Sequence, residues 1–126
     1  MIVKKIPLLI FILILHVFPV NAFNEKDLEK LKSTKECVKC DLRRANLSES
    51  NLKGANLEEA NLGRANLTDA DLSGANLTNA DLRRADIFDS DLTGANLKGA
   101  KLSVGGLSAL VCHTIMPDGK ENNSDC

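Results

Sequence analysis

The sequence contains no tryptophan and no tyrosine, and only four of its 126 residues are phenylalanine. Two of these phenylalanines lie in an apolar stretch at the N-terminus, so Phe23 and Phe88 are the aromatic residues of the remaining chain. Proteins that hold nucleic-acid bases by stacking use aromatic side chains for this purpose. The composition therefore argues strongly against recognition of bases or sugars by stacking.

The chain also lacks a large excess of charge of either sign. After residue 22 it carries 14 lysines and arginines, since Lys4 and Lys5 lie before that point, against 17 aspartates and glutamates. The net charge of this part is therefore 14 minus 17, or about −3. So small an excess selects no class of partner.

Residues 1–22 have the layout of a secretory signal peptide. Lys4 and Lys5 give a positively charged start, residues 6–20 are almost wholly apolar, and Val20 to Ala22 form an acceptable cleavage site. The apolar run has about 15 residues, whereas a membrane-spanning helix needs about 20. We expect cleavage after Ala22 and export to the periplasm or the medium; an uncleaved membrane anchor is the alternative.

From residue 40 to residue 104 the chain repeats in units of five. Leucine, or isoleucine once, stands at thirteen successive positions from Leu42 to Leu102. Two residues before each of these centres stands alanine, serine or Cys40, and the residue between is Asn or Asp in every unit except the last. No unit is long enough to bury its leucine alone, so neighbouring units must stack on one another.

A period of five fits neither an α-helix nor a continuous strand. It differs from 3.6 residues per helical turn, and because it is odd, a continuous strand would point every second leucine outward. Within one unit, however, the small residue and the leucine can both point inward, and the last two residues can turn a corner. Such a chain winds into a coil with an apolar interior. We expect the outward Asn and Asp side chains to form hydrogen-bonded ladders between coils.

This pattern resembles the pentapeptide-repeat family over residues 40–104. The resemblance implies an all-β fold, a right-handed quadrilateral β-helix in which four pentapeptides make one coil, with about three coils here. The sequence has a matching slow period, because Arg44, Arg64 and Arg84 occupy equivalent places four units apart. With stacked strands ~4.8 Å apart, the repeat column is expected to be about 15 Å tall.

Both ends of such a column need caps, because exposed apolar side chains and unpaired backbone promote aggregation. Residues 23–39 are expected to supply the N-terminal cap, with a helix over residues 24–35 that Asn24 caps. Residues 105–126 leave the repeat and are expected to supply the C-terminal cap, in which MPDG predicts a tight turn. The stretches CVKCDLRRANL and CHTIMPDGKENNSDC also resemble those of small exported bacterial members of the family.

The four cysteines all lie outside the apolar N-terminal stretch, and an even number in a short exported chain favours disulfides. The column separates them into two pairs, so we expect Cys37–Cys40 and Cys112–Cys126 bonds. The Cys37–Cys40 ring is short and strained, and its pairing stays open. A C-x-x-C spacing is also shared with thiol oxidoreductases and half-zinc sites, but these need a βαβ context or four ligands. We expect no metal, no cofactor and no catalytic residue, and we interpret His113 as a tail residue.

One outward side of the column is rich in basic residues. The four-unit register places six basic side chains there against two acidic ones, Asp41 and Asp81, while the next side is acidic and exposes Phe88. Either the neighbouring acids, Asp86 among them, neutralise the arginines, or the basic side docks a partner through complementary charge. The candidate partner face consists of Arg43, Arg44, Arg64, Arg83, Arg84 and Lys101.

We therefore expect an exported, non-enzymatic scaffold that binds another protein and takes no small-molecule substrate. Contact with the membrane is expected only during passage of the signal peptide, and the partner's identity and the oligomeric state stay open. Two alternatives stay open as well. One is the DNA-mimicking, gyrase-interacting role that the resemblance suggests, although a short and nearly neutral column fits it poorly. The other is a thiol redox protein that uses Cys37 and Cys40.

Export gives a direct prediction. Protein isolated from its native host should lack residues 1–22 and begin at Phe23, because the charged start, the apolar run and the cleavage site occur in the required order. Intact-mass measurement checks this. A full-length cytoplasmic chain as the main species would contradict it and would favour the DNA-mimicking alternative.

Overall fold

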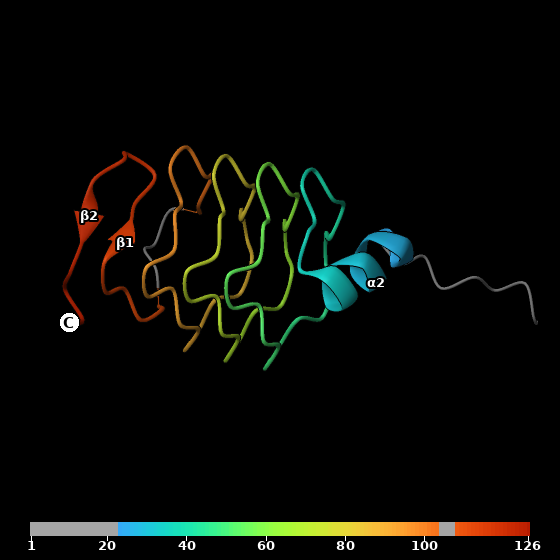
Figure 1. Ribbon diagram of the computed structural model, residues 1–126, viewed down its shortest axis with the longest axis horizontal. Coiled ribbons are helices and arrows are strands. Elements are labelled where there is room, and N and C mark those ends of the chain that lie inside the picture. The colour runs from blue at the N-terminus through green and yellow to red at the C-terminus, as the bar shows by residue number, and fades with distance from the viewer. Residues whose placement is uncertain (1–22, 104–107) are drawn as a thin grey trace, which may run out of the picture.

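The computed structural model describes residues 23–103 and 108–126, so the expected signal peptide and Val104 to Leu107 lie outside the described residues. A helix, α2 (Glu25–Thr34), lies at one end of a column of stacked coils. A short hairpin of β1 (Thr114–Ile115) and β2 (Glu121–Asn122) lies at the other end (Figure 1). The predicted helix over residues 24–35 is thus confirmed.

The column is built from isolated parallel bridges between equivalent residues of successive coils. Asp41 pairs with Asn61, and Asn61 pairs with Asp81, so the same strand position recurs in three successive coils. Four five-residue units separate each residue from its stacked partner. The 20-residue spacing of Arg44, Arg64 and Arg84 is therefore the spacing of stacked residues in the column, because four units return the chain to the same side.

The interior of the column contains the side chains that the five-residue pattern predicts. The centre leucines as far as Leu97 are at most 3% exposed, and nearly all alanines two residues before a centre are buried as well. Ala85, Ile87 and Leu102 are partly exposed but still pack against this core. Burying one such leucine is worth about 2 kcal/mol, so the stacked interior is the main favourable term in the fold.

Each unit ends in a turn that the small residue closes. The N–H of Ala45, for example, donates to the Leu42 carbonyl at 3.0 Å. The residue before the small one has a positive φ, as Arg44 does at 61°, which is the requirement of the third residue in a type II turn. Glycine adopts this conformation without steric cost, which explains its recurrence at Gly54 and Gly74.

The Asn or Asp before each centre accepts a hydrogen bond from a backbone N–H of its own unit. Between Asn61 and Ala65, four of the five backbone N–H groups donate to backbone carbonyls. The remaining N–H, of Gly63, donates to Asn61 Oδ1 at 3.1 Å. The same side-chain bond recurs in every unit from Asp41 to Asn96. A short side-chain acceptor is therefore needed at this position, because stacking leaves one N–H unpaired.

The predicted side-chain ladders between coils are largely wrong. Within the described residues, one short ladder forms, in which Asn76 Nδ2 donates to Asn56 Oδ1 at 3.4 Å and Asn56 Nδ2 donates to Glu36 Oε2 at 3.1 Å. Elsewhere the Asn and Asp oxygens are engaged with the N–H two residues further along their own unit. The local bond competes successfully because it closes a short turn.

The N-terminal helix packs on the first coil and forms hydrogen bonds with its exposed backbone groups. Asn24 caps α2 by accepting from the Lys26 N–H at 3.0 Å, and Leu31 is fully buried against the core. Asp27 Oδ2 accepts from the Asp41 N–H at 2.8 Å, while the Asn24 N–H donates to the Asp41 carbonyl at 2.9 Å. The helix therefore replaces, at this strand position, the coil that would otherwise precede Asp41.

The described part of the C-terminal tail keeps the stacking of the column as far as Ile115, although its sequence has left the five-residue pattern. Val111 occupies a centre position and is 5% exposed, and Thr114 occupies a small-residue position and is fully buried. His113 has a φ of 50°, as the turn position before a small residue requires. The bridges of Asp91 with Leu110 and of Asn96 with Ile115 are each one residue shorter in spacing than those of the regular coils.

The MPDG stretch forms the predicted tight turn and ends the column. The Gly119 N–H donates to the Met116 carbonyl at 2.8 Å, and the Met116 N–H donates to the Lys120 carbonyl at 2.8 Å. The chain then reverses, so that β2 runs antiparallel to β1. A two-residue strand that carries an exposed charge at Glu121 is a poor template for a further strand, which limits edge-to-edge association.

The interior makes a prediction about substitutions in a middle unit. Leu72 is fully buried, and Leu72→Ala is expected to lower the free energy of unfolding by about 2–5 kcal/mol. Ala75→Phe should destabilise more than Ser73→Phe, because Ala75 is 1% exposed whereas Phe88 natively occupies the position equivalent to Ser73. Urea denaturation measures all three; equal losses at residues 73 and 75 would contradict the inward and outward assignment.

Candidate functional site

The basic side chains of the candidate partner face are held in line by backbone stacking. The Arg44 N–H donates to the Gly63 carbonyl at 3.0 Å, and the Arg64 N–H donates to the Arg83 carbonyl at 3.1 Å. Arg44, Arg64 and Arg84 share the left-handed turn position, with φ of 61°, 61° and 62°. All three are exposed, so the column presents them as a regular row. We call these three residues the arginine row.

Two other arginines on this side are neutralised within their own units. Arg43 Nε lies 2.8 Å from Asp41 Oδ1, and Arg83 Nε lies 2.8 Å from Asp81 Oδ1; both pairs are bidentate. Hydrogen bonds from these side chains hold the pKa of each aspartate below its ordinary value. Exposed pairs of this kind add little stability. They do remove Arg43 and Arg83 as free cations.

The arginine row has no such partner. Within residues 23–103 and 108–126, no carboxylate lies within ion-pair distance of Arg44, Arg64 or Arg84. The expected neutralisation by Asp86 is not formed, and Asp86 Oδ1 accepts from the Phe88 N–H. Like charges stacked about 5 Å apart repel one another, which makes an external anion favourable at this row.

The adjacent side presents a matching acidic row and one aromatic side chain. Glu49, Asp69 and Asp89 occupy the same turn position, with φ of 56°, 57° and 53°. Phe88 is 55% exposed beside them, as the sequence predicts. Lys101 extends the basic side at its far end, where its N–H donates to the Ala80 carbonyl at 2.9 Å. The turn positions of these two sides therefore form rows of opposite charge.

The Cys37–Cys40 bond is present and belongs to the architecture of the column. Cys37 takes the place of a centre leucine and Cys40 that of an inward alanine, and the Cys40 N–H donates to the Cys37 carbonyl as in the turns of the later units. The parallel pairing accordingly starts at Glu36, which bridges to Asn56. The two cysteines are 0% and 4% exposed, so the bond between them is shielded from a thiolate in solution.

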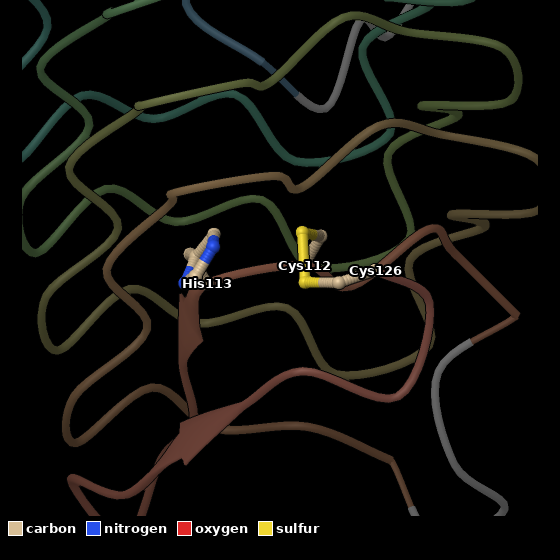
Figure 2. Close-up of side chains that lie close together, drawn as sticks. All are labelled: Cys112, His113 and Cys126. Carbon is tan, nitrogen blue, oxygen red and sulfur yellow. A yellow bond between two sulfur atoms is a disulfide. The ribbon is translucent and has the colours of Figure 1, made fainter.

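The Cys112–Cys126 bond is also present, and it differs in being accessible. Its Cα atoms are 4.9 Å apart, Cys112 is partly exposed and Cys126 is exposed. Figure 2 shows the bond beside the side chain of His113, at the base of β1. His113 Nδ1 lies 2.7 Å from Glu121 Oε1. This is the one group of potential metal ligands among the described residues, and its two sulfur atoms are joined to each other.

The two cysteine pairs lie at opposite ends of the column. Cys37 Sγ lies 3.2 Å from the Asp27 carbonyl oxygen of α2, whereas Cys112 lies two residues before β1. A zinc site that combines ligands from both pairs is therefore excluded. Sequence reasoning placed both disulfides correctly, but it missed the association of His113 with Cys112 and Glu121. The signal for it was the continued spacing of Val111 and Met116, which places His113 at a turn.

Comparison with known proteins identifies the family. The family model described as pentapeptide repeats (8 copies) matches residues 37–64 and 65–103, just over half of the chain. The chain belongs to the pentapeptide-repeat family, and its column is the right-handed β-helix of that family. No curated protein matches this chain.

Two solved structures are similar to it. A pentapeptide repeat protein from the thylakoid lumen of Arabidopsis thaliana is 33% identical, with a TM-score of 0.59, over 63% of this chain and 56% of that one. HetL, a pentapeptide repeat protein involved in heterocyst differentiation regulation in the cyanobacterium Nostoc sp. strain PCC 7120, is 29% identical, with a TM-score of 0.33, over 69% of this chain and 62% of that one. The chain thus spans little more than half the length of these relatives.

None of the helices within the described residues is both long and apolar enough to cross a bilayer.

The difference in exposure between the disulfides gives a prediction. Under native conditions a dithiol reductant should open Cys112–Cys126 well before Cys37–Cys40, because exchange requires in-line access of a thiolate to a sulfur atom. Timed alkylation followed by peptide mass mapping measures the order. Labelling of Cys37 at the same rate as Cys126 would show that the first turn is not packed as described.

Proposed function

We propose that this protein is an exported, non-enzymatic scaffold whose arginine row binds an acidic surface of another protein. The observation that carries the proposal is the row itself, in which Arg44, Arg64 and Arg84 are exposed, evenly spaced and free of carboxylate partners among the described residues. In this proposal the quadrilateral column of about three coils serves mainly to fix that spacing.

A rigid support strengthens such a site. Long basic side chains lose conformational freedom when a partner binds, but the backbone beneath them is already ordered by stacking bonds. The three guanidinium groups can therefore act together on a partner with a similar spacing of carboxylates. Complementary charge of this kind accelerates encounter and selects the partner, rather than supplying all of the affinity. Exposed Phe88 on the adjoining side offers an apolar contact next to the charged ones.

Export is supported by three independent features. Residues 1–22 have the layout of a signal peptide. All four cysteines are paired in disulfides, which persist mainly in oxidising compartments. A similar protein of 33% identity resides in the thylakoid lumen. The periplasm and the extracellular medium are both compatible with these features.

The absence of an enzymatic role is inferred from the chemistry of the site. His113 is the sole histidine after residue 22, and its ring is engaged with Glu121 beside a disulfide rather than beside a serine or a thiol. General-base catalysis needs a nucleophile or substrate proton within hydrogen-bond reach. Pentapeptide-repeat proteins are generally scaffolds without catalytic activity, which agrees with this inference.

The two alternatives are weaker. A DNA-mimicking surface needs a continuous acidic face, whereas here an acidic row adjoins a basic one. A redox function at Cys37 and Cys40 needs an accessible sulfur atom, whereas both residues are buried within a turn.

Reversal of one charge tests the proposal. Arg64→Glu inverts the centre of the arginine row, and the backbone should accept it because Glu49 and Glu59 hold the same left-handed turn position. Stability should change by no more than about 0.5 kcal/mol, as for other surface sites. Capture of the native partner from host extract should fall sharply. Capture by the unmodified protein should also weaken with salt, because the Debye length falls from ~10 Å at 0.1 M to ~3 Å at 1 M.

The matched control is Lys98→Glu, an equal charge reversal at an exposed residue on another side of the column. It should leave partner capture unchanged. If Arg64→Glu and Lys98→Glu reduce capture equally, net charge rather than the arginine row is responsible. If Arg64→Glu destabilises the fold and leaves capture intact, the row has a structural role and the proposal fails.

A further inference from the structure

The tail brings together two cysteines and a histidine in an arrangement that the scaffold function does not use. The sulfur atoms of Cys112 and Cys126 and a ring nitrogen of His113 all lie within 4.8 Å of one another. Figure 2 shows the imidazole next to the two sulfur atoms. Thiolate and imidazole are the ligands that Zn²⁺ prefers, and a set of two cysteines and one histidine leaves a fourth position for water.

We propose that reduction of Cys112–Cys126 by a dithiol converts the tail into a binding site for one Zn²⁺ ion. In the reduction, the dithiol supplies two electrons and two protons, the sulfur–sulfur bond breaks to give two thiols, and the dithiol becomes a disulfide. When Zn²⁺ binds, each thiol releases its proton and its sulfur forms a bond to the metal. The disulfide state has no thiolate to offer and does not bind the ion.

The site does not depend on the sulfur–sulfur bond to hold its ligands together. The Val111 N–H donates to Asp125 Oδ2 at 2.9 Å, and the Asp125 N–H donates to the Val111 carbonyl at 3.3 Å. These two bonds join the residues next to Cys112 and Cys126. After reduction the two thiols therefore stay close, and a small outward movement of the sulfur atoms makes room for the metal.

Contacts with Asn123 and Glu121 hold His113 in place. The His113 N–H donates to Asn123 Oδ1 at 2.9 Å, which ties the turn to the segment that carries Cys126. Glu121 Oε1 lies 2.7 Å from His113 Nδ1, and an ionised carboxylate can only accept, so Nδ1 carries the proton. This leaves the lone pair of Nε2 for the metal. A carboxylate behind the histidine is the usual arrangement at zinc sites, where it orients the ring and raises its basicity.

The other cysteine pair lacks these features. Cys37 and Cys40 are buried in a turn of the column, and the chain after residue 22 has no other histidine to complete a site there. The proposal therefore applies to the tail alone. It is also independent of the arginine row, so failure of either proposal leaves the other standing.

The experiment uses the chain as purified from its host, together with a variant carrying Cys37→Leu and Cys40→Ala. These substitutions place in the first unit the residues found at the same positions of the other units, and they leave Cys112 and Cys126 as the remaining thiols. Each protein is reduced, freed of reductant under anaerobic conditions and titrated with Co²⁺, a spectroscopic substitute for Zn²⁺. Circular dichroism establishes that the column is intact in each sample.

Reduced protein should bind one equivalent of Co²⁺ with thiolate-to-metal charge-transfer absorption and the intense visible bands of tetrahedral coordination, and Zn²⁺ should displace it. Oxidised protein should show neither signal. Glu121→Gln should weaken binding about 10- to 100-fold, the usual effect of removing a carboxylate that supports a metal ligand, and His113→Ala should weaken it further. Asp118→Asn, which removes another carboxylate of the same hairpin, should leave the affinity unchanged.

Three results would overturn the proposal. The first is a reduced tail that does not bind Co²⁺ or binds it without thiolate charge transfer. The second is equal binding before and after reduction. The third is an unchanged affinity in His113→Ala, since a site of two thiolates alone is not the one described.

Discussion

The fold depends on one constraint: each unit must point its leucine inward and still find hydrogen-bond partners for its backbone N–H and C=O groups. Stacking of each unit on the equivalent unit of the next coil satisfies most of these groups, the turn satisfies another, and one N–H remains, on the residue after the centre. The Asn or Asp side chain accepts from that N–H. The polar residue before each of these centres therefore completes the hydrogen bonding of its unit, while the leucine supplies the apolar interior.

The same constraint explains the two ends. A parallel stack has an open edge at each end, where strands lack partners. At the first edge, Asn24 and Asp27 supply a donor and an acceptor to Asp41, as a preceding coil would. At the last edge, the tail keeps the parallel pairing as far as Ile115 and then reverses through MPDG into an antiparallel strand. The two disulfides lie in these end regions, where fewer coils hold the chain.

Much of this architecture could be predicted from the sequence because the repeat is unusually regular. Thirteen successive centres predict which side chains are buried, and the spacing of Arg44, Arg64 and Arg84 predicts the stacking distance. The tail was harder to predict, since one residue is missing from its spacing and Val111 and Met116 replace leucine. Ion pairing was hardest, because every Asp before a centre accepts from the N–H two residues later. Asp41 and Asp81 also bind an arginine of their own unit, whereas Asp86 does not bind Arg84.

The regularity that makes the interior predictable also governs the surface. A column repeats its outward positions as strictly as its inward ones, so any charge at a turn position forms a row when it recurs in the next coil. Arg43 and Arg83 stand one position earlier in their turns, and each is paired with the aspartate two residues before it. Arg44, Arg64 and Arg84 hold the next position of the turn, which has a left-handed backbone, and none of them is paired with the Asn or Asp of its own unit. Lys39, at the same turn position of another side, does meet a carboxylate, because Glu59 is its neighbour in the next coil. The arginine row lacks such a pair because its stacked neighbours are themselves arginines, and this is the feature on which the proposed docking of an acidic partner rests.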